Sequence, residues 1–117
     1  GTTTHPEVRA LSQALEGAST VVTTGLVLQE LLQGFNGARA ATAIVSRFAT
    51  LPFIAPDRTD HVAAAEIRNN CRRAGVQIGT IGAVLIQLCV RHDLILLTTD
   101  KDFFHAMIHV PFRLWHS

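Results

Sequence analysis

Charged residues are scarce in this chain of 117 residues: they make up 16% of it, against about 25% in a typical globular domain, while hydrophobic residues make up 48%. This composition excludes a disordered or polyelectrolyte chain and predicts one sizeable core with further apolar surface for interfaces. Lysine is almost absent, because nine of the ten basic residues are Arg and only Lys101 is Lys. Any cationic patch would therefore recognise phosphate or carboxylate groups through guanidinium forks. The net charge of +1 predicts no partner by itself.

Cysteines are also few, and no long hydrophobic run occurs. Cys71 and Cys89 form no CxxC motif and do not amount to a disulfide framework, which favours a reducing, cytoplasmic setting. The most apolar stretch, residues 78–90, is shorter than the roughly 20 residues that a transmembrane helix needs. The chain opens with polar residues and no signal-peptide pattern. We therefore expect no membrane contact.

Helical periodicity alternates with short β-branched runs along the whole chain. The patterns predict helices over residues 5–16, 24–34, 36–48, 57–75, 81–91 and 100–108, and strands over residues 19–23, 53–55, 94–98 and 112–115. The predicted helix caps are Thr24, Asn36, Asp57 and Thr80. Short apolar strands between helices indicate an α/β fold with a mostly parallel sheet covered on both faces. No linker or repeat divides residues 1–117, so we expect a single domain.

The helix predicted over residues 57–75 has a mixed pattern. Val62, Ala65, Ile67 and Cys71 are expected to face the core. A cluster of three arginines, residues 68, 72 and 73, lies off that stripe. These side chains could contact phosphates, or they could form a solvated face that pairs with Glu66.

Three acidic residues are candidates for chemistry. Asp100 follows the strongest strand pattern, at the carboxyl edge where open α/β sheets bind ligands, and Asp102 comes two residues later. Both also suit the start of a helix, where acids meet the positive end of the helix dipole. Glu30 lies among leucines on an apolar helix and needs solvent, a partner or a metal ion. Each residue therefore has both a structural and a functional interpretation.

Other reactive side chains give weaker patterns. His105 and His109 have the i, i+4 spacing of zinc ligands, but no further ligands complete a site. Cys89 and His92 lie on adjacent helical turns, although Cys89 belongs to an apolar helix and is better explained as a buried thiol. Neither a P-loop nor a GxGxxG motif occurs, which disfavours nucleotide-dependent activities.

Three segments have an informative order and spacing: VVTTGLVLQELLQG at residues 21–34, AAAEIR at 63–68 leading into RRAG at 72–75, and LLTTDKDF at 96–103. Together they resemble the PIN-domain ribonucleases, specifically the toxins of VapBC-type toxin–antitoxin pairs. The Thr-x-Asp-x-Asp-Phe segment is the most specific of them. The resemblance implies a three-layer α/β/α domain that cleaves RNA at a Mg²⁺ or Mn²⁺ site built from about four acids.

On this resemblance, Glu30 matches the acid of the second helix, Asp100 matches the acid after the late strand, and Asp102 is an auxiliary acid. Two features depart from the family pattern. No Asp-bearing strand precedes the first helix, so we expect the chain to be an N-terminally incomplete piece of the domain. Gly82 stands where the family usually has an Asp, and nothing in a helical backbone requires glycine there.

The most consistent interpretation is a VapC-like endoribonuclease toxin whose activity is impaired in this chain. One alternative is a catalytically inactive PIN-like binding module that acts with an antitoxin in DNA-binding autoregulation. A second alternative is a receiver-like phosphoacceptor domain that uses Asp100, although no paired acids support it.

Four expectations follow for the structure and its assembly. The carboxylates of Glu30 and Asp100 should converge at the carboxyl edge of the sheet. A homodimer or a complex with a cognate antitoxin should bury apolar surface near the early helices. The arginine cluster should contact RNA phosphates only if its helix borders the acidic cleft. Replacing Gly82 with Asp should not destabilise the fold, and with an added upstream Asp-bearing strand it should restore cleavage.

Overall fold

The structure is a computed structural model that describes residues 22–34, 37–98 and 100–115. These residues form two compact units that meet in the sequence between Ala55 and Pro56. The part before this boundary is called the helical unit here, and the part after it the sheet unit. The predicted helix over residues 5–16 lies outside the described residues, as does most of the predicted strand over residues 19–23. The single domain over residues 1–117 stays a prediction.

The helical unit contains two helices that pack together: α2 (Gly25–Gly34) and α3 (Ala38–Phe48). Thr24 caps α2 as predicted, because its Oγ1 accepts a hydrogen bond from the backbone N–H of Leu26 at 3.4 Å. The predicted cap of the next helix is wrong. Gly37, and not Asn36, is the N-cap of α3. Its φ of +100° is a backbone conformation that residues other than glycine rarely adopt.

The two predicted strands of the helical unit meet in a single parallel bridge between Thr23 and Phe53. Thr23 donates its N–H to the carbonyl of Pro52 at 2.9 Å and accepts from the N–H of Ile54 at 2.7 Å. A strand pairing therefore exists where residues 53–55 were predicted to be extended, but it is one bridge long.

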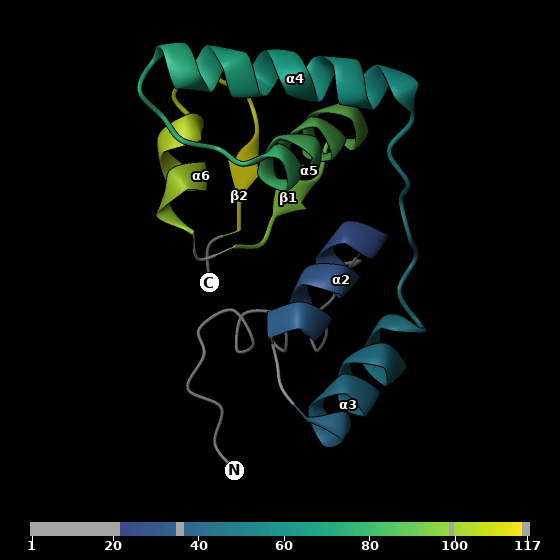
Figure 1. The fold of residues 1–117 in the computed structure, drawn as a ribbon. Helices are drawn as coiled ribbons and strands as arrows, with labels where there is room; N and C mark the ends of the chain where they lie inside the picture. Colours follow the sequence, from purple (N-terminus) through teal and green to yellow (C-terminus); the bar gives the residue numbers. More distant parts are fainter. Residues whose placement is uncertain (1–21, 35–36, 99, 116–117) are drawn as a thin grey trace. The chain divides into compact units, whose positions relative to one another are not determined.

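The sheet unit contains three helices and two strands: α4 (Arg58–Arg73), α5 (Thr80–His92), β1 (Ile95–Leu96), α6 (Lys101–Ala106) and β2 (Arg113–Leu114). The strands pair in parallel, with Ile95 opposite Arg113 and Leu96 opposite Leu114 (Figure 1). Helix α4 packs along α5, and α5 packs against β1. The predicted α/β class with a small parallel sheet is therefore confirmed.

Strand β1 begins one residue later than the predicted strand over residues 94–98, because Leu94 makes a hydrogen bond to the end of helix α5 instead. Helix α5 ends at Asp93, which has the left-handed φ of 53°. The N–H of Leu94 then donates to the carbonyl of Cys89 at 2.8 Å and closes the helix end. At the other end, Trp115 N–H donates to Leu96 O at 2.8 Å and extends the contact with β2 by one residue.

The buried face of α4 differs from the predicted one. Its buried residues are Asp60, Ala64, Ile67 and Cys71, spaced at four, three and four residues. Val62 is 61% exposed and Ala65 is also exposed, so their predicted inward orientation is wrong. The hydrophobic pattern predicted the wrong buried face because the first buried residue of α4 is Asp60, which is not hydrophobic.

Helix α5 supplies much of the core of the sheet unit, as its apolar sequence predicts. Its buried residues are Ala83, Val84, Ile86, Leu88 and Cys89. Thr80 is the first residue of this helix and not its cap, because Gly79 occupies the cap position without a side-chain hydrogen bond. Among the described residues, no helix is long and apolar enough to cross a membrane.

A reciprocal capping box fixes the start of α4. Asp57 Oδ1 accepts the N–H of Asp60 at 2.9 Å, and Asp60 Oδ2 accepts the N–H of Asp57 at 2.9 Å. The hydroxyl of Thr59 also donates to Asp57 Oδ1, at 2.7 Å. The Asp57-x-x-Asp60 spacing is a readable signal for this box, and it confirms Asp57 as the predicted cap.

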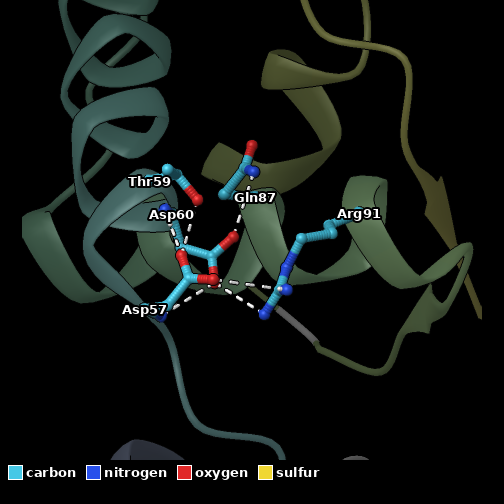
Figure 2. A network of polar contacts seen from close by, with 5 residues as sticks. All are labelled: Asp57, Thr59, Asp60, Gln87 and Arg91. Carbon is cyan, nitrogen blue, oxygen red and sulfur yellow. Dashed lines mark hydrogen bonds and ion pairs between the residues drawn. The ribbon is translucent and has the colours of Figure 1, made fainter.

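Asp60 also joins α4 to α5 (Figure 2). Its side chain is 0% exposed, and Arg91 Nη2 lies 2.8 Å from Oδ2. Gln87 Nε2 donates to Oδ1 at 3.2 Å. A buried carboxylate requires such donors, because leaving it without them costs several kcal/mol on the scale of ion desolvation. Asp57 Oδ2, at 3.5 Å from Arg91, adds a weaker and more exposed contact.

Replacing Arg91 with Met should destabilise the sheet unit by about 2 to 3 kcal/mol. Loss of one partner of a fully buried pair costs about 3 to 5 kcal/mol, and this side chain is itself 37% exposed, which reduces the cost. The matched control is Arg113→Met, which breaks the exposed pair with Asp93 and should cost less than about 1 kcal/mol. Urea denaturation of both variants measures the difference, and equal losses would contradict a special role for the buried pair.

Acid should weaken the start of α4 through Asp57. The hydrogen bonds from Thr59 and then from the Asp60 amide lower the pKa of Asp57 below its usual 3.8. The folded state then holds fewer protons than the unfolded state between the two values, so this stability is present above pH 3.8 and is lost as the pH falls through the folded pKa. Asp57→Asn should flatten the acid limb of stability against pH, as measured by thermal melts from pH 2 to 6, whereas an unchanged limb would exclude Asp57 as its source.

Candidate functional site

Asp100 lies just past β1 and is the N-cap of α6. Its carboxylate accepts the N–H of Asp102 at 2.9 Å, and its own N–H donates to Thr98 Oγ1 at 3.1 Å. The side chain therefore has the structural role of a helix cap, and it also stands at the carboxyl end of a parallel strand, as predicted. Asp102 follows in the first turn of α6, and both side chains are exposed.

Glu30 lies on α2, in the helical unit, and is exposed. Next to it in the sequence, Gln29 donates to Gln33 at 2.8 Å along the same helix. Because Glu30 and Asp100 belong to separate units, the predicted convergence of their carboxylates stays a prediction.

Gly82 lies in the first turn of α5, in close contact with α6 and the preceding loop. A Cβ atom at this position would stand 3.1 Å from Cζ of Phe103 and 3.2 Å from Cγ2 of Ile78. Phe103 and Ile78 are both buried. The glycine therefore has a packing reason in this structure, because a Cβ atom at position 82 would require the Phe103 ring or Ile78 to move by a few tenths of an ångström. This contact argues against the expectation that Asp would fit here without cost, and that expectation stays a prediction.

The three arginines of α4 make local hydrogen bonds. Arg68 Nε donates to the carbonyl of Ile78 at 3.0 Å and joins α4 to the loop before α5. Arg72 donates to Asn69 at 2.6 Å, and Arg73 donates to Asn70. All three side chains belong to exposed residues.

Helix α4 and the start of α6 lie on opposite sides of the sheet unit (Figure 1). The arginines of α4 therefore do not surround Asp100. Their predicted contact with RNA phosphates stays a prediction, and in the structure Arg68 also has the structural role of holding the loop carbonyl of Ile78.

The carboxylates of the sheet unit do not by themselves fit a divalent metal ion. Mg²⁺ and Mn²⁺ prefer several oxygen ligands, and position 82 supplies none. Asp100 already accepts a backbone N–H, and Asp102 is its only acidic neighbour in α6. Among residues 22–34, 37–98 and 100–115, no three His, Cys, Asp or Glu side chains gather closely enough to hold an ion. Glu30 from the helical unit would have to complete such a site.

Cys89 is a poor nucleophile in this setting. It is 7% exposed on the inner face of α5, and burial raises the pKa of its thiol to about 11. The thiol is therefore protonated near neutral pH. This geometry agrees with the interpretation of Cys89 as a structural thiol.

The sequence analysis did not predict the polar cluster that joins α4 to α5, which consists of Asp57, Asp60, Gln87 and Arg91. The capping-box spacing could have identified its first half. Nothing in the local pattern shows that Gln87 and Arg91 of α5 would meet Asp60. The cluster holds two helices together and does not itself offer an open site, since Asp60 is fully buried.

Comparison with protein families gives one match. Residues 2–107 match the model of the PIN domain, which is well over half of the chain. A search of curated proteins gives no match.

Replacing Gly82 with Asp should destabilise the sheet unit by about 1 to 2 kcal/mol, because overpacking a core commonly costs about 1 to 3 kcal/mol and helix propensity returns only part of that. Gly82→Ala adds the same Cβ without the charge and should show most of the loss. Adding Phe103→Leu to Gly82→Asp should remove part of the penalty, so the double variant should be more stable than the sum of the single changes. Thermal and urea unfolding of the four proteins measure this coupling, and a neutral Gly82→Ala would contradict the contact.

Proposed function

Since the chain belongs to the PIN-domain family, we propose that it is a VapC-like ribonuclease toxin of a toxin–antitoxin pair, with nuclease activity weakened by Gly82. PIN domains are generally nucleases, often ribonucleases that depend on a divalent metal ion. RNA is accordingly the proposed substrate, and hydrolysis of its phosphodiester bonds the proposed reaction. Such a toxin would act in the cytoplasm.

The single observation that supports the proposal of a weakened activity is the packing of Phe103 against Gly82. Hydrolysis of an anionic phosphodiester needs cations that converging carboxylates hold in place. A family acid is absent at position 82, and the ring of Phe103 would lie only 3.1 Å from a Cβ atom placed there. The remaining acids are too few for an ion that gives up its water shell reluctantly.

Glu30 and Asp100 are the residues that would hold Mg²⁺ or Mn²⁺, with Asp102 as an auxiliary acid. When bound, the metal ion would activate water and offset charge on the phosphate. Capping of α6 fixes the Asp100 carboxylate at the end of β1, since one of its oxygens accepts the N–H of Asp102. This leaves the other oxygen available to a ligand. Asp102 contributes negative charge from the same exposed turn.

The apolar surface of the helical unit supports the proposal of a protein partner. Helix α2 contains four leucines but no buried residue, and Val45 and Phe53 are 50% and 51% exposed. Apolar side chains left this open are typical of surfaces that associate with another chain. A second copy of this chain or a cognate antitoxin is the proposed partner.

The packing of Gly82 also favours a second candidate, an inactive PIN-like module that binds an antitoxin and helps it bind DNA without cleaving RNA. The two candidates differ in their response to metal. A weakened nuclease should bind Mn²⁺ through Glu30 and Asp100, whereas an inactive module should not.

Cleavage of a structured RNA in Mg²⁺ or Mn²⁺ tests the proposal. The unmodified chain should cleave slowly or not at all. Gly82→Asp combined with Phe103→Leu should be faster by at least about tenfold, a threshold set below the roughly 100- to 1,000-fold that one preorganised electrostatic group is worth. Phe103→Leu alone is the matched control and should not accelerate cleavage.

Removing the metal ion with a chelator, or adding Asp100→Asn to the double variant, should abolish the gained cleavage. Cleavage that survives Asp100→Asn would place the chemistry on other residues. An absence of cleavage in every variant, together with no Mn²⁺ binding by calorimetry, would favour the inactive module.

A further inference from the structure

A shallow hollow opens between α4 and α5, on the face of these helices that carries Arg68. Its volume is about 200 Å³. The deepest lining residues are Ala64, Ala83 and Val84, which are small or apolar and each no more than 4% exposed. Short side chains on both helices therefore form an apolar floor, which the described residues of the sheet unit leave open.

The rim of the hollow is polar. It is lined by Arg68, Asn69 and His61 of α4 and by Thr80 at the start of α5. Arg68 is held in place, because its Nε donates to the carbonyl of Ile78 at 3.0 Å. That bond uses one of its five N–H donors and leaves the terminal amino groups for a ligand.

The charge of this rim selects an anion. Among the described residues no carboxylate lines the hollow, whereas the guanidinium of Arg68 does. Arg72 and Arg73 follow on the same helix and extend the positive charge beyond the hollow, with Glu66 as the nearest acid in the sequence of α4. An apolar floor beside the fixed guanidinium of Arg68 suits a ligand that combines a ring with a phosphate.

We propose that this hollow binds one nucleotide of single-stranded RNA, with the base on the alanine floor and the phosphate on the guanidinium of Arg68. The hollow is smaller than a typical site for a whole drug-sized molecule, so it takes a single nucleotide of a longer strand. Asn69 and Thr80 offer hydrogen bonds to base edges, and His61 offers a ring on which a base can stack. The proposal rests on RNA as the substrate of the proposed nuclease, and it adds a binding position that contains none of the residues proposed to hold a metal ion.

The first test is an NMR titration of the ¹⁵N-labelled full chain with AMP, with inorganic phosphate and with adenosine, all without divalent metal. AMP should shift the amides of Asn69, Thr80 and Ala83 and bind more tightly than either phosphate or adenosine. Equal binding of phosphate and AMP would reduce the hollow to a phosphate site and overturn the proposal, as would an absence of shifts at these residues.

Two variants test the hollow by different routes. Arg68→Gln should weaken AMP binding by at least about fivefold, as loss of a hydrogen bond from a charged group requires. Ala65→Leu, at an exposed lining position, fills the hollow and removes no hydrogen bond, so it should have a similar effect even if Arg68→Gln unfolds. Val62→Leu is the matched control on the same helix, outside the lining, and should leave AMP binding unchanged.

A fluorescent RNA hexamer, again without metal, extends the test to a strand. Arg68→Gln should lower the dependence of log K on log salt by about 0.7, the value for one phosphate contact to single-stranded RNA. Tighter binding of an acidic hexapeptide than of the RNA would assign the hollow to a protein partner and overturn the proposal. RNA binding that persists while Gly82→Asp combined with Phe103→Leu also fails to cleave would contradict the proposed nuclease alone. Cleavage by that double variant that is unaffected by adding Ala65→Leu or Arg68→Gln would contradict the hollow alone.

Discussion

The buried carboxylate of Asp60 is the constraint on which the sheet unit depends. A fully buried charge must be surrounded by donors, and here they come from the start of its own helix and from Gln87 and Arg91 in the second half of α5. The N-terminal end of α4 is thereby placed beside the C-terminal half of α5. At the opposite end, Arg68 bonds to the loop just before α5. These two polar contacts fix the helix pair at both ends, and the buried alanines between them bring the helices together.

The same packing decides what the candidate site can contain. The first turn of α5 is brought against α6, so Phe103 fills the space beside Gly82. Asp100 likewise serves the fold, because it caps α6 while standing at the end of β1. In this chain, positions suited to chemistry are therefore also used for packing and capping. A side chain at position 82 would press against the Phe103 ring, so the packing of α6 limits what this position can carry.

The helical unit presents a different situation. Its strand pairing is a single bridge between Thr23 and Phe53, and α2 buries none of its leucines among the described residues. A helix that is apolar on so much of its surface needs another surface to cover it. Glu30 lies on this helix, so the acid that would complete a metal site and the apolar surface that would bind a partner share one element.

The sequence by itself determined the local features of this protein. Thr24 and Asp57 begin helices where their side chains can accept backbone N–H groups, and Gly75, with φ +81°, follows the end of α4 as glycine should. The alternation of helices with short apolar strands was sufficient for the α/β class. The order and spacing of the acidic segments were sufficient for the resemblance to PIN domains, which the family match over residues 2–107 confirms.

Only the tertiary structure decided which residues meet. Hydrophobic periodicity predicted that Val62 and Ala65 of α4 face the core, whereas Asp60 is the residue that is buried. No local pattern indicates this burial, because Gln87, which donates to Asp60, lies 27 residues away in the sequence. The packing of Gly82 could not be predicted either, because glycine has no side chain that contributes to a hydrophobic pattern. The contact that disfavours a larger residue there comes from Phe103 of another helix. Caps and turns depend on neighbours in sequence and can be read locally. Buried charges and close approaches depend on neighbours in space, and these exist only once the helices have packed.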